Sequence, residues 1–165
     1  MRTTILSIVT GLGFAFAATF AVAQDDQGLS KVQIDRAVQS FDSGAQVCAN
    51  ADAVYRLDCF QQVFSRTARV FGRASAYWEA DVALTRVSRN LFSFVRANTH
   101  EALGRQKMNG SRVKPITEAS VPEATALYRT NVDRAAADLV SGSKYEADFF
   151  RPISDVILKY SDALN

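Results

Sequence analysis

Hydrophobic positions recur at steps of three and four along most of this chain, which is the spacing of one face of an α-helix. The first such stripe consists of Ile34, Val38, Phe41, Ala45 and Cys48. Ser30 stands where it can cap this helix. The pair Ser43 and Gly44 predicts an early end, because glycine tolerates the left-handed conformation that follows a helix. Cys48 is then expected in or beside a loop.

Two longer stripes follow between residues 52 and 103, and they are out of phase. One consists of Phe60, Phe64, Thr67, Phe71, Ala74 and Trp78, the other of Tyr77, Ala80, Leu84, Val87, Leu91 and Phe94. At about 100° per residue, the two stripes lie roughly 150° apart around a continuous helix, which would be roughly 75 Å long. We therefore predict a break between Gly72 and Asp81, with a single bent helix as the alternative.

Residues 104–120 lack a helical stripe and contain the turn-forming Asn109, Gly110 and Pro115, so they are predicted to form the main loop. No alternating apolar and polar run of useful length occurs. The chain is therefore predicted to be all-α, a bundle of about five helices with one disulfide.

Two capping boxes predict where the last helices begin. Ser120 and Glu123 form the first, and Ser143 and Glu146 form the second. Pro152 lies within the last stripe and is expected to kink or divide that helix, since proline lacks the amide hydrogen that a helix interior uses.

Residues 1–23 are typical of a secretory signal peptide. Arg2 is the only charge before Asp25, an apolar run follows it, and the segment ends in the small-residue pattern Ala21-Val22-Ala23. An uncleaved membrane anchor is the alternative. Residues 24–165 are predicted to form a single helical domain in the periplasm, with secretion as the second choice of location.

The chain has two cysteines, Cys48 and Cys59. An even count in a short exported chain predicts a disulfide between them, with two free buried thiols as the alternative. Their spacing does not match a CxxC redox pair. The single histidine, His100, lies far along the chain, so we predict no metal site and no cofactor.

No set of residues resembles a catalytic site. Glu79 and Asp81 are two carboxylates near aromatic side chains, but at this spacing they point about 200° apart on a helix and cannot share a substrate. Tyr77 and Trp78 are interpreted as core and interface residues. We therefore predict no catalytic residues, with a small enzyme that lacks a recognisable motif as an alternative.

Charge is unevenly distributed along the chain. Residues 60–114 carry a net charge of +7, whereas residues 24–59 and 115–165 carry −3 each. The predicted partner-binding residues are Arg66, Arg69, Arg73, Arg105, Lys107, Arg112 and Lys114. The simpler explanation for them is a solvated helix face paired with acidic neighbours in the bundle. The sharper hypothesis is a contact surface for an acidic envelope protein or for an anionic membrane surface. Nucleic acid is not an expected partner of an exported chain.

The run Ala53-Val-Tyr-Arg-Leu-Asp-Cys59-Phe60, preceded by Cys48, resembles a signature of small exported proteobacterial proteins, in which a first cysteine precedes an Arg-Leu-x-Cys-Tyr/Phe run. Where that signature has an Asp after the aromatic residue, this chain has Gln61. The resemblance implies export and a Cys48–Cys59 bridge, and it implies no activity. The resulting hypothesis is a non-enzymatic exported protein that binds another envelope component.

Overall fold

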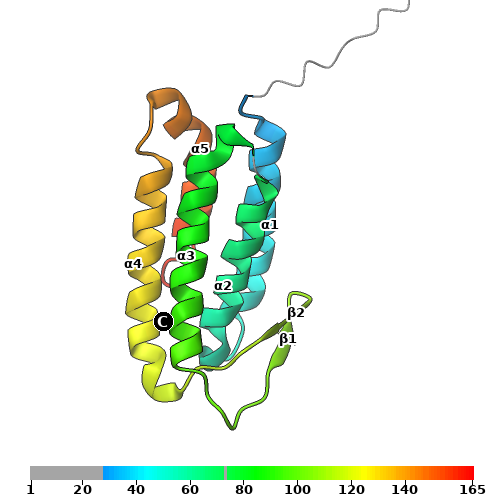
Figure 1. Ribbon diagram of the computed structural model, residues 1–165, viewed down its shortest axis with the longest axis vertical. Coiled ribbons are helices and arrows are strands. Elements are labelled where there is room, and N and C mark those ends of the chain that lie inside the picture. The colour runs from blue at the N-terminus through cyan, green and yellow to red at the C-terminus, as the bar shows by residue number, and fades with distance from the viewer. Residues whose placement is uncertain (1–27, 73) are drawn as a thin grey trace, which may run out of the picture.

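The structure is a computed structural model that describes residues 28–72 and 74–165, and it confirms an all-α bundle of five helices (Figure 1). The helices are α1 (Lys31–Ala49), α2 (Ala53–Val70), α3 (Trp78–Ala97), α4 (Val121–Leu139) and α5 (Lys144–Leu158). A two-stranded sheet, β1 (Gln106–Met108) and β2 (Ser111–Val113), forms a hairpin beside the bundle. The predicted signal peptide and Arg73 lie outside the described residues.

The helices form a closed ring around an aromatic core. Each helix from α1 to α4 packs against the next helix in the chain, and α5 packs against α1 and so closes the ring. Phe41 and Phe64 meet edge to face at 4.9 Å, and Phe60 lies 5.0 Å from Tyr128. The buried Tyr128 hydroxyl donates to the backbone oxygen of Tyr160 at 3.1 Å. Such aromatic pairs contribute about 1 kcal/mol each beyond the area that they bury.

Helix α1 does not end at Gly44, so the predicted early stop is wrong. A Cβ atom at this position would lie 2.8 Å from Cγ2 of Val63 on α2. The glycine therefore allows two helices to approach closely, and it is buried inside α1. As a consequence, Cys48 lies in the last turn of α1 and not in a loop.

The disulfide between Cys48 and Cys59 is confirmed, and it joins two helices. The two Cα atoms are 5.5 Å apart, and both side chains are buried. Closing a loop with a sequence separation of 11 residues stabilises the fold by about 3 kcal/mol in the chain-entropy model.

The predicted break between the second and third stripes is also confirmed. Helix α2 ends at Val70, Gly72 adopts a left-handed φ of 61°, and a short 3₁₀ turn covers Ser75–Tyr77 before α3 begins. Tyr77 is buried as expected. Trp78 is not a core residue, because 67% of its surface is exposed.

The predicted loop at residues 104–120 contains the hairpin, which was not predicted. Asn109 and Gly110 form its turn with φ values of 50° and 74°, as a type I′ turn requires. Each strand has only three residues, which is too short to show an alternating pattern.

The capping predictions have mixed outcomes. Ser143 and Glu146 form the predicted box, with both reciprocal hydrogen bonds present. Helix α4 does begin after Ser120, but that hydroxyl donates to Asn98 Oδ1 at 3.0 Å and makes no cap. Pro152 lies inside α5, which continues undivided to Leu158. Among the helices of residues 28–72 and 74–165, none is both long and apolar enough to span a bilayer.

Candidate functional site: a basic cleft

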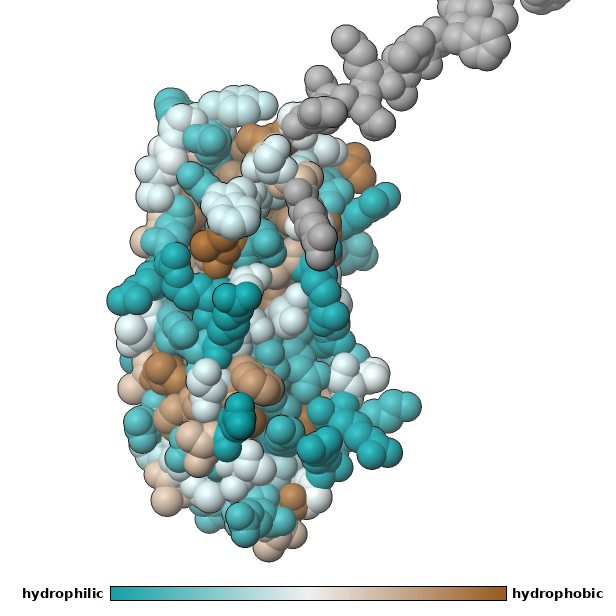
Figure 2. All heavy atoms as spheres, in the orientation of Figure 1, coloured by the Kyte–Doolittle hydropathy of each residue, from teal (hydrophilic) through white to brown (hydrophobic). Residues whose placement is uncertain are grey.

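Four of the seven predicted partner-binding residues line one cleft between α2, α3 and β2. We call it the basic cleft; its volume is about 270 Å³. It is lined by Asp58, Gln61, Gln62, Ser65, Arg66, Arg69, Phe92, Ser111, Arg112 and Lys114. Figure 2 shows strongly hydrophilic side chains where the hairpin projects from the bundle.

Side chains of α2 hold the β2 side of the cleft through hydrogen bonds to its backbone. Gln62 Nε2 donates to the backbone oxygen of Arg112 at 3.1 Å, and Asp58 Oδ2 accepts from the backbone nitrogen of Lys114 at 2.7 Å. These bonds satisfy groups on the edge of β2 that β1 does not pair. The backbone of β2 is thus fixed, and the side chains of Arg112 and Lys114 remain on the cleft.

Arg66 fixes the hairpin turn rather than standing free. Its Nη1 donates to the backbone oxygen of Asn109 at 2.5 Å. Partial burial, together with the nearby charge of Arg69, lowers the pKa of Arg66 from its usual value. A guanidinium remains protonated at neutral pH even so, and Arg66 adds positive charge to the cleft wall.

The hairpin turn also contacts the disulfide. Asn109 Nδ2 donates to the backbone oxygen of Gly44 at 3.0 Å and lies 3.7 Å from the sulfur of Cys48 and 3.9 Å from that of Cys59. The side chain of one turn residue therefore touches α1 and the cystine together. This contact sets the position of β2 against α2.

Asp58 is the one acidic residue that lines the cleft. Its side chain is buried, and this burial raises its pKa, while hydrogen bonds from Lys114 and Gln62 act in the opposite direction. With four basic side chains around one carboxylate, the cleft is electropositive whether or not Asp58 is ionised.

Phe92 of α3 is an apolar member of the cleft that was not among the predicted binding residues. It is 45% exposed, and Lys114 Nζ lies 6.0 Å from the centre of its ring. It falls outside the apolar stripe of its helix, which was the available signal. A basic cleft with one accessible ring suits a partner that combines acidic groups with an apolar side chain.

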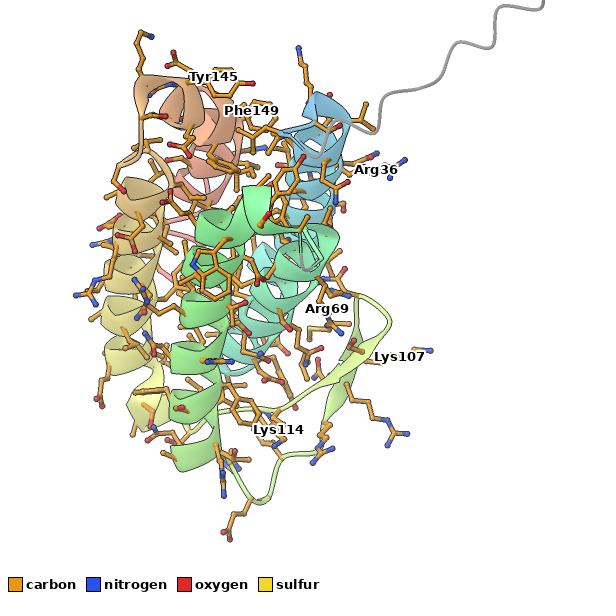
Figure 3. All side chains as sticks on the ribbon, turned by 45° about the horizontal axis from the view of Figure 1, so that its top comes forward. Arg36, Arg69, Lys107, Lys114, Tyr145 and Phe149 are labelled. Carbon is orange, nitrogen blue, oxygen red and sulfur yellow. A yellow bond between two sulfur atoms is a disulfide. The ribbon has the colours of Figure 1, made fainter. Side chains whose placement is uncertain are left out.

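Three of the predicted residues are not placed in the cleft. Lys107 lies on β1 and points away from the bundle (Figure 3). By contrast, Arg69 lies on the α2 side of the cleft and Lys114 on its β2 side. Arg105 is exposed in the segment before β1. Arg73 lies outside the described residues.

Pairing with acidic neighbours explains few of the basic residues in this region. The described part of the chain contains five ion pairs, formed by Arg86, Arg129, Lys144, Arg151 and Lys159. Of the described basic residues between 66 and 114, which leave out Arg73, only Arg86 takes part, and its Nη1 lies 2.8 Å from Asp138. Within the described residues, none of the four cations of the cleft has an ion-pair partner.

The groups considered for chemistry lie outside the cleft. His100 follows α3, and its Nδ1 accepts a hydrogen bond from the backbone nitrogen of Leu103 at 3.2 Å. In the ranges 28–72 and 74–165, no group of three or more His, Cys, Asp or Glu side chains is placed to hold a metal ion.

Comparison of the chain with protein-family models, with curated proteins and with solved structures gives no significant match.

Proposed function

We propose that this protein is a non-enzymatic exported binding protein, and that the basic cleft binds an acidic segment of another protein of the cell envelope. The observation that carries the proposal is the convergence of Arg66, Arg69, Arg112 and Lys114 on one cleft. Their charges have no ion-pair partner among the described residues.

Two features support export to the periplasm. The apolar segment that ends at Ala23 has the pattern of a secretory signal. The buried Cys48–Cys59 disulfide is compatible with an oxidising compartment.

Electrostatics determines what such a cleft can provide. Exposed ion pairs contribute little, about 0–1 kcal/mol each. A partner that fills the cleft would remove water around Arg66 and Lys114, and this would strengthen the ion pairs that these two residues form with the partner. Complementary charge also raises the association rate, and this effect falls steeply with ionic strength. Binding is therefore expected to be strongly dependent on salt.

The test uses the oxidised chain without residues 1–23 and a fluorescein-labelled polyglutamate peptide. Fluorescence anisotropy at about 50 mM and about 300 mM salt should show binding that weakens as salt screens the charges. The variant Arg69→Glu/Arg112→Glu should weaken binding at least about tenfold, which corresponds to about 1.4 kcal/mol.

The matched control is Arg36→Glu/Arg134→Glu, which changes the net charge equally. Arg36 and Arg134 are exposed, have no ion pair in the described chain and lie on α1 and α4 (Arg36 is labelled in Figure 3). Equal weakening in both double variants would show attraction to net charge alone and would refute the cleft. Flotation with phosphatidylglycerol vesicles, lost only in the cleft variant and without peptide binding, would assign the cleft to a membrane surface instead.

A further inference from the structure

The only tryptophan of the chain stands on the surface, at the start of α3. Trp78 is 67% exposed. The preceding residue, Tyr77, occupies the core instead and stacks on Phe71 with ring centres 5.2 Å apart. Because neighbouring residues differ by about 100° around a helix, burying Tyr77 turns Trp78 outward. The packing of the bundle does not use this large side chain.

Two hollows lie beside Trp78, and we call them together the Trp78 groove. The first, of about 350 Å³, is lined by residues of α3 that include Asp81, Arg86, Arg89 and Asn90. The second, of about 200 Å³, lies towards the end of α4 and includes Glu79 and Asp138. Both are lined by Trp78, Val82 and Arg86, so the two hollows adjoin at these side chains.

Hydrogen bonds within the groove hold several of its polar groups in place. Arg86 Nη1 is paired with Asp138 at 2.8 Å, and Asn90 Nδ2 donates to Asn131 Oδ1 at 2.6 Å. Each of these groups keeps further donors or acceptors, since a guanidinium has five N–H groups and a carboxylate has two oxygens. The groove therefore offers oriented donors and acceptors around an aromatic face.

The charge of this groove differs from that of the basic cleft. Three acidic side chains face two basic ones, so the charges nearly balance. Its large apolar side chains are Trp78 and Val82, too few for an apolar protein partner. A nearly neutral site with one aromatic platform and many hydrogen-bonding groups suits a neutral ligand with many hydroxyl groups.

We infer that the Trp78 groove binds a neutral oligosaccharide, as found in the glycans of a cell envelope. One face of a pyranose ring carries C–H groups that can pack on the indole, while its hydroxyls reach the groups of Asp81, Arg89 and Asn90. The inference does not depend on the basic cleft. It uses the proposed export only to explain where the protein meets a glycan.

The chain provides its own reporter for the test, because a single tryptophan makes its intrinsic fluorescence specific for the groove. The oxidised chain without residues 1–23 is titrated with N-acetylglucosamine tetramer, cellotetraose and maltotetraose. At least one of them should shift or quench the emission in a saturable way. Added polyglutamate peptide should not displace it, which separates this site from the basic cleft.

Variants locate the binding. Calorimetry should show that Trp78→Ala abolishes binding and that Arg89→Ala weakens it about tenfold, as the loss of a hydrogen bond from a charged group predicts. Tyr145→Ala is the matched control, since Tyr145 is an exposed aromatic side chain on α5 that lines neither the groove nor the basic cleft. No saturable response to the three sugars, or unchanged affinity in Trp78→Ala with far-UV circular dichroism intact, would overturn the inference.

Discussion

Replacing Gly44 with alanine should force α1 and α2 apart where Gly44 packs against Val63. The added Cβ would lie 2.8 Å from Val63 Cγ2 and 3.3 Å from Cγ1, whereas carbon atoms pack at about 3.5–4.0 Å. Val63 is buried and β-branched, so it has one strongly preferred rotamer in a helix. The Cys48–Cys59 disulfide, one turn further along α1, restrains the two helices from separating.

Two opposing terms set the size of the effect. Overpacking costs about 1–3 kcal/mol, and replacing glycine by alanine inside a helix stabilises it by about 1 kcal/mol. We expect Gly44→Ala to lower the free energy of unfolding by about 1 kcal/mol. Val63→Ala alone should lower it by about 2 kcal/mol through lost packing. In the double variant the clash is absent, so the loss should be about 2 kcal/mol smaller than the sum of the two.

Urea unfolding of the oxidised chain, followed by far-UV circular dichroism, measures all four corners of this cycle. Ser43→Ala is the control, because Ser43 is an exposed neighbour on α1 and its substitution should change stability by less than about 0.5 kcal/mol. A stabilising Gly44→Ala variant, or strict additivity with Val63→Ala, would refute the close approach of the two helices.

Three further variants test the disulfide, the hairpin and the buried carboxylate. Cys48→Ser/Cys59→Ser should lower the free energy of unfolding by about 3 kcal/mol in urea, and a loss below about 1 kcal/mol would show that the bridge is absent or strained. Asn109→Ala should cost about 2 kcal/mol, from its left-handed φ and the unpaired Gly44 oxygen, whereas Asn109→Gly should cost less; equal costs would argue against the type I′ turn. Burial raises the pKa of Asp58, so the folded state binds more protons than the unfolded state in the window between pH 3.8 and the raised pKa of the folded state. Stability contributed by Asp58 should therefore fall as pH rises through that window, and a decline equally steep in Asp58→Asn would contradict this.

The helices could be predicted because the apolar residues that each helix buries recur in the sequence at helical spacing. Gly44 shows the limit of this approach. In a sequence, a glycine that ends a helix looks the same as one that admits a neighbouring helix, and only the position of Val63 distinguishes the two. Trp78 is a similar case, because its apolar character fits a stripe, but its neighbour Tyr77 takes the place in the core.

The cleft could be predicted in part. Arg66 and Arg69 share a helix face by their spacing alone, so their grouping follows from the sequence. Arg112 and Lys114 join them only because the hairpin folds back on α2. The dipeptide Asn109-Gly110 was the available signal for that turn, but the pairing of β2 with the side chains of α2 is a tertiary contact.

The cystine is the point where α1, α2 and the hairpin turn meet, and this has a consequence for maturation. A chain that has not yet been oxidised lacks the bond against which Asn109 is seated, and its β2 strand is held less firmly. If the protein is exported as proposed, its recognition surface is completed only on arrival outside the reducing cytoplasm. Premature capture of acidic cytoplasmic proteins by a newly made chain would thereby be reduced.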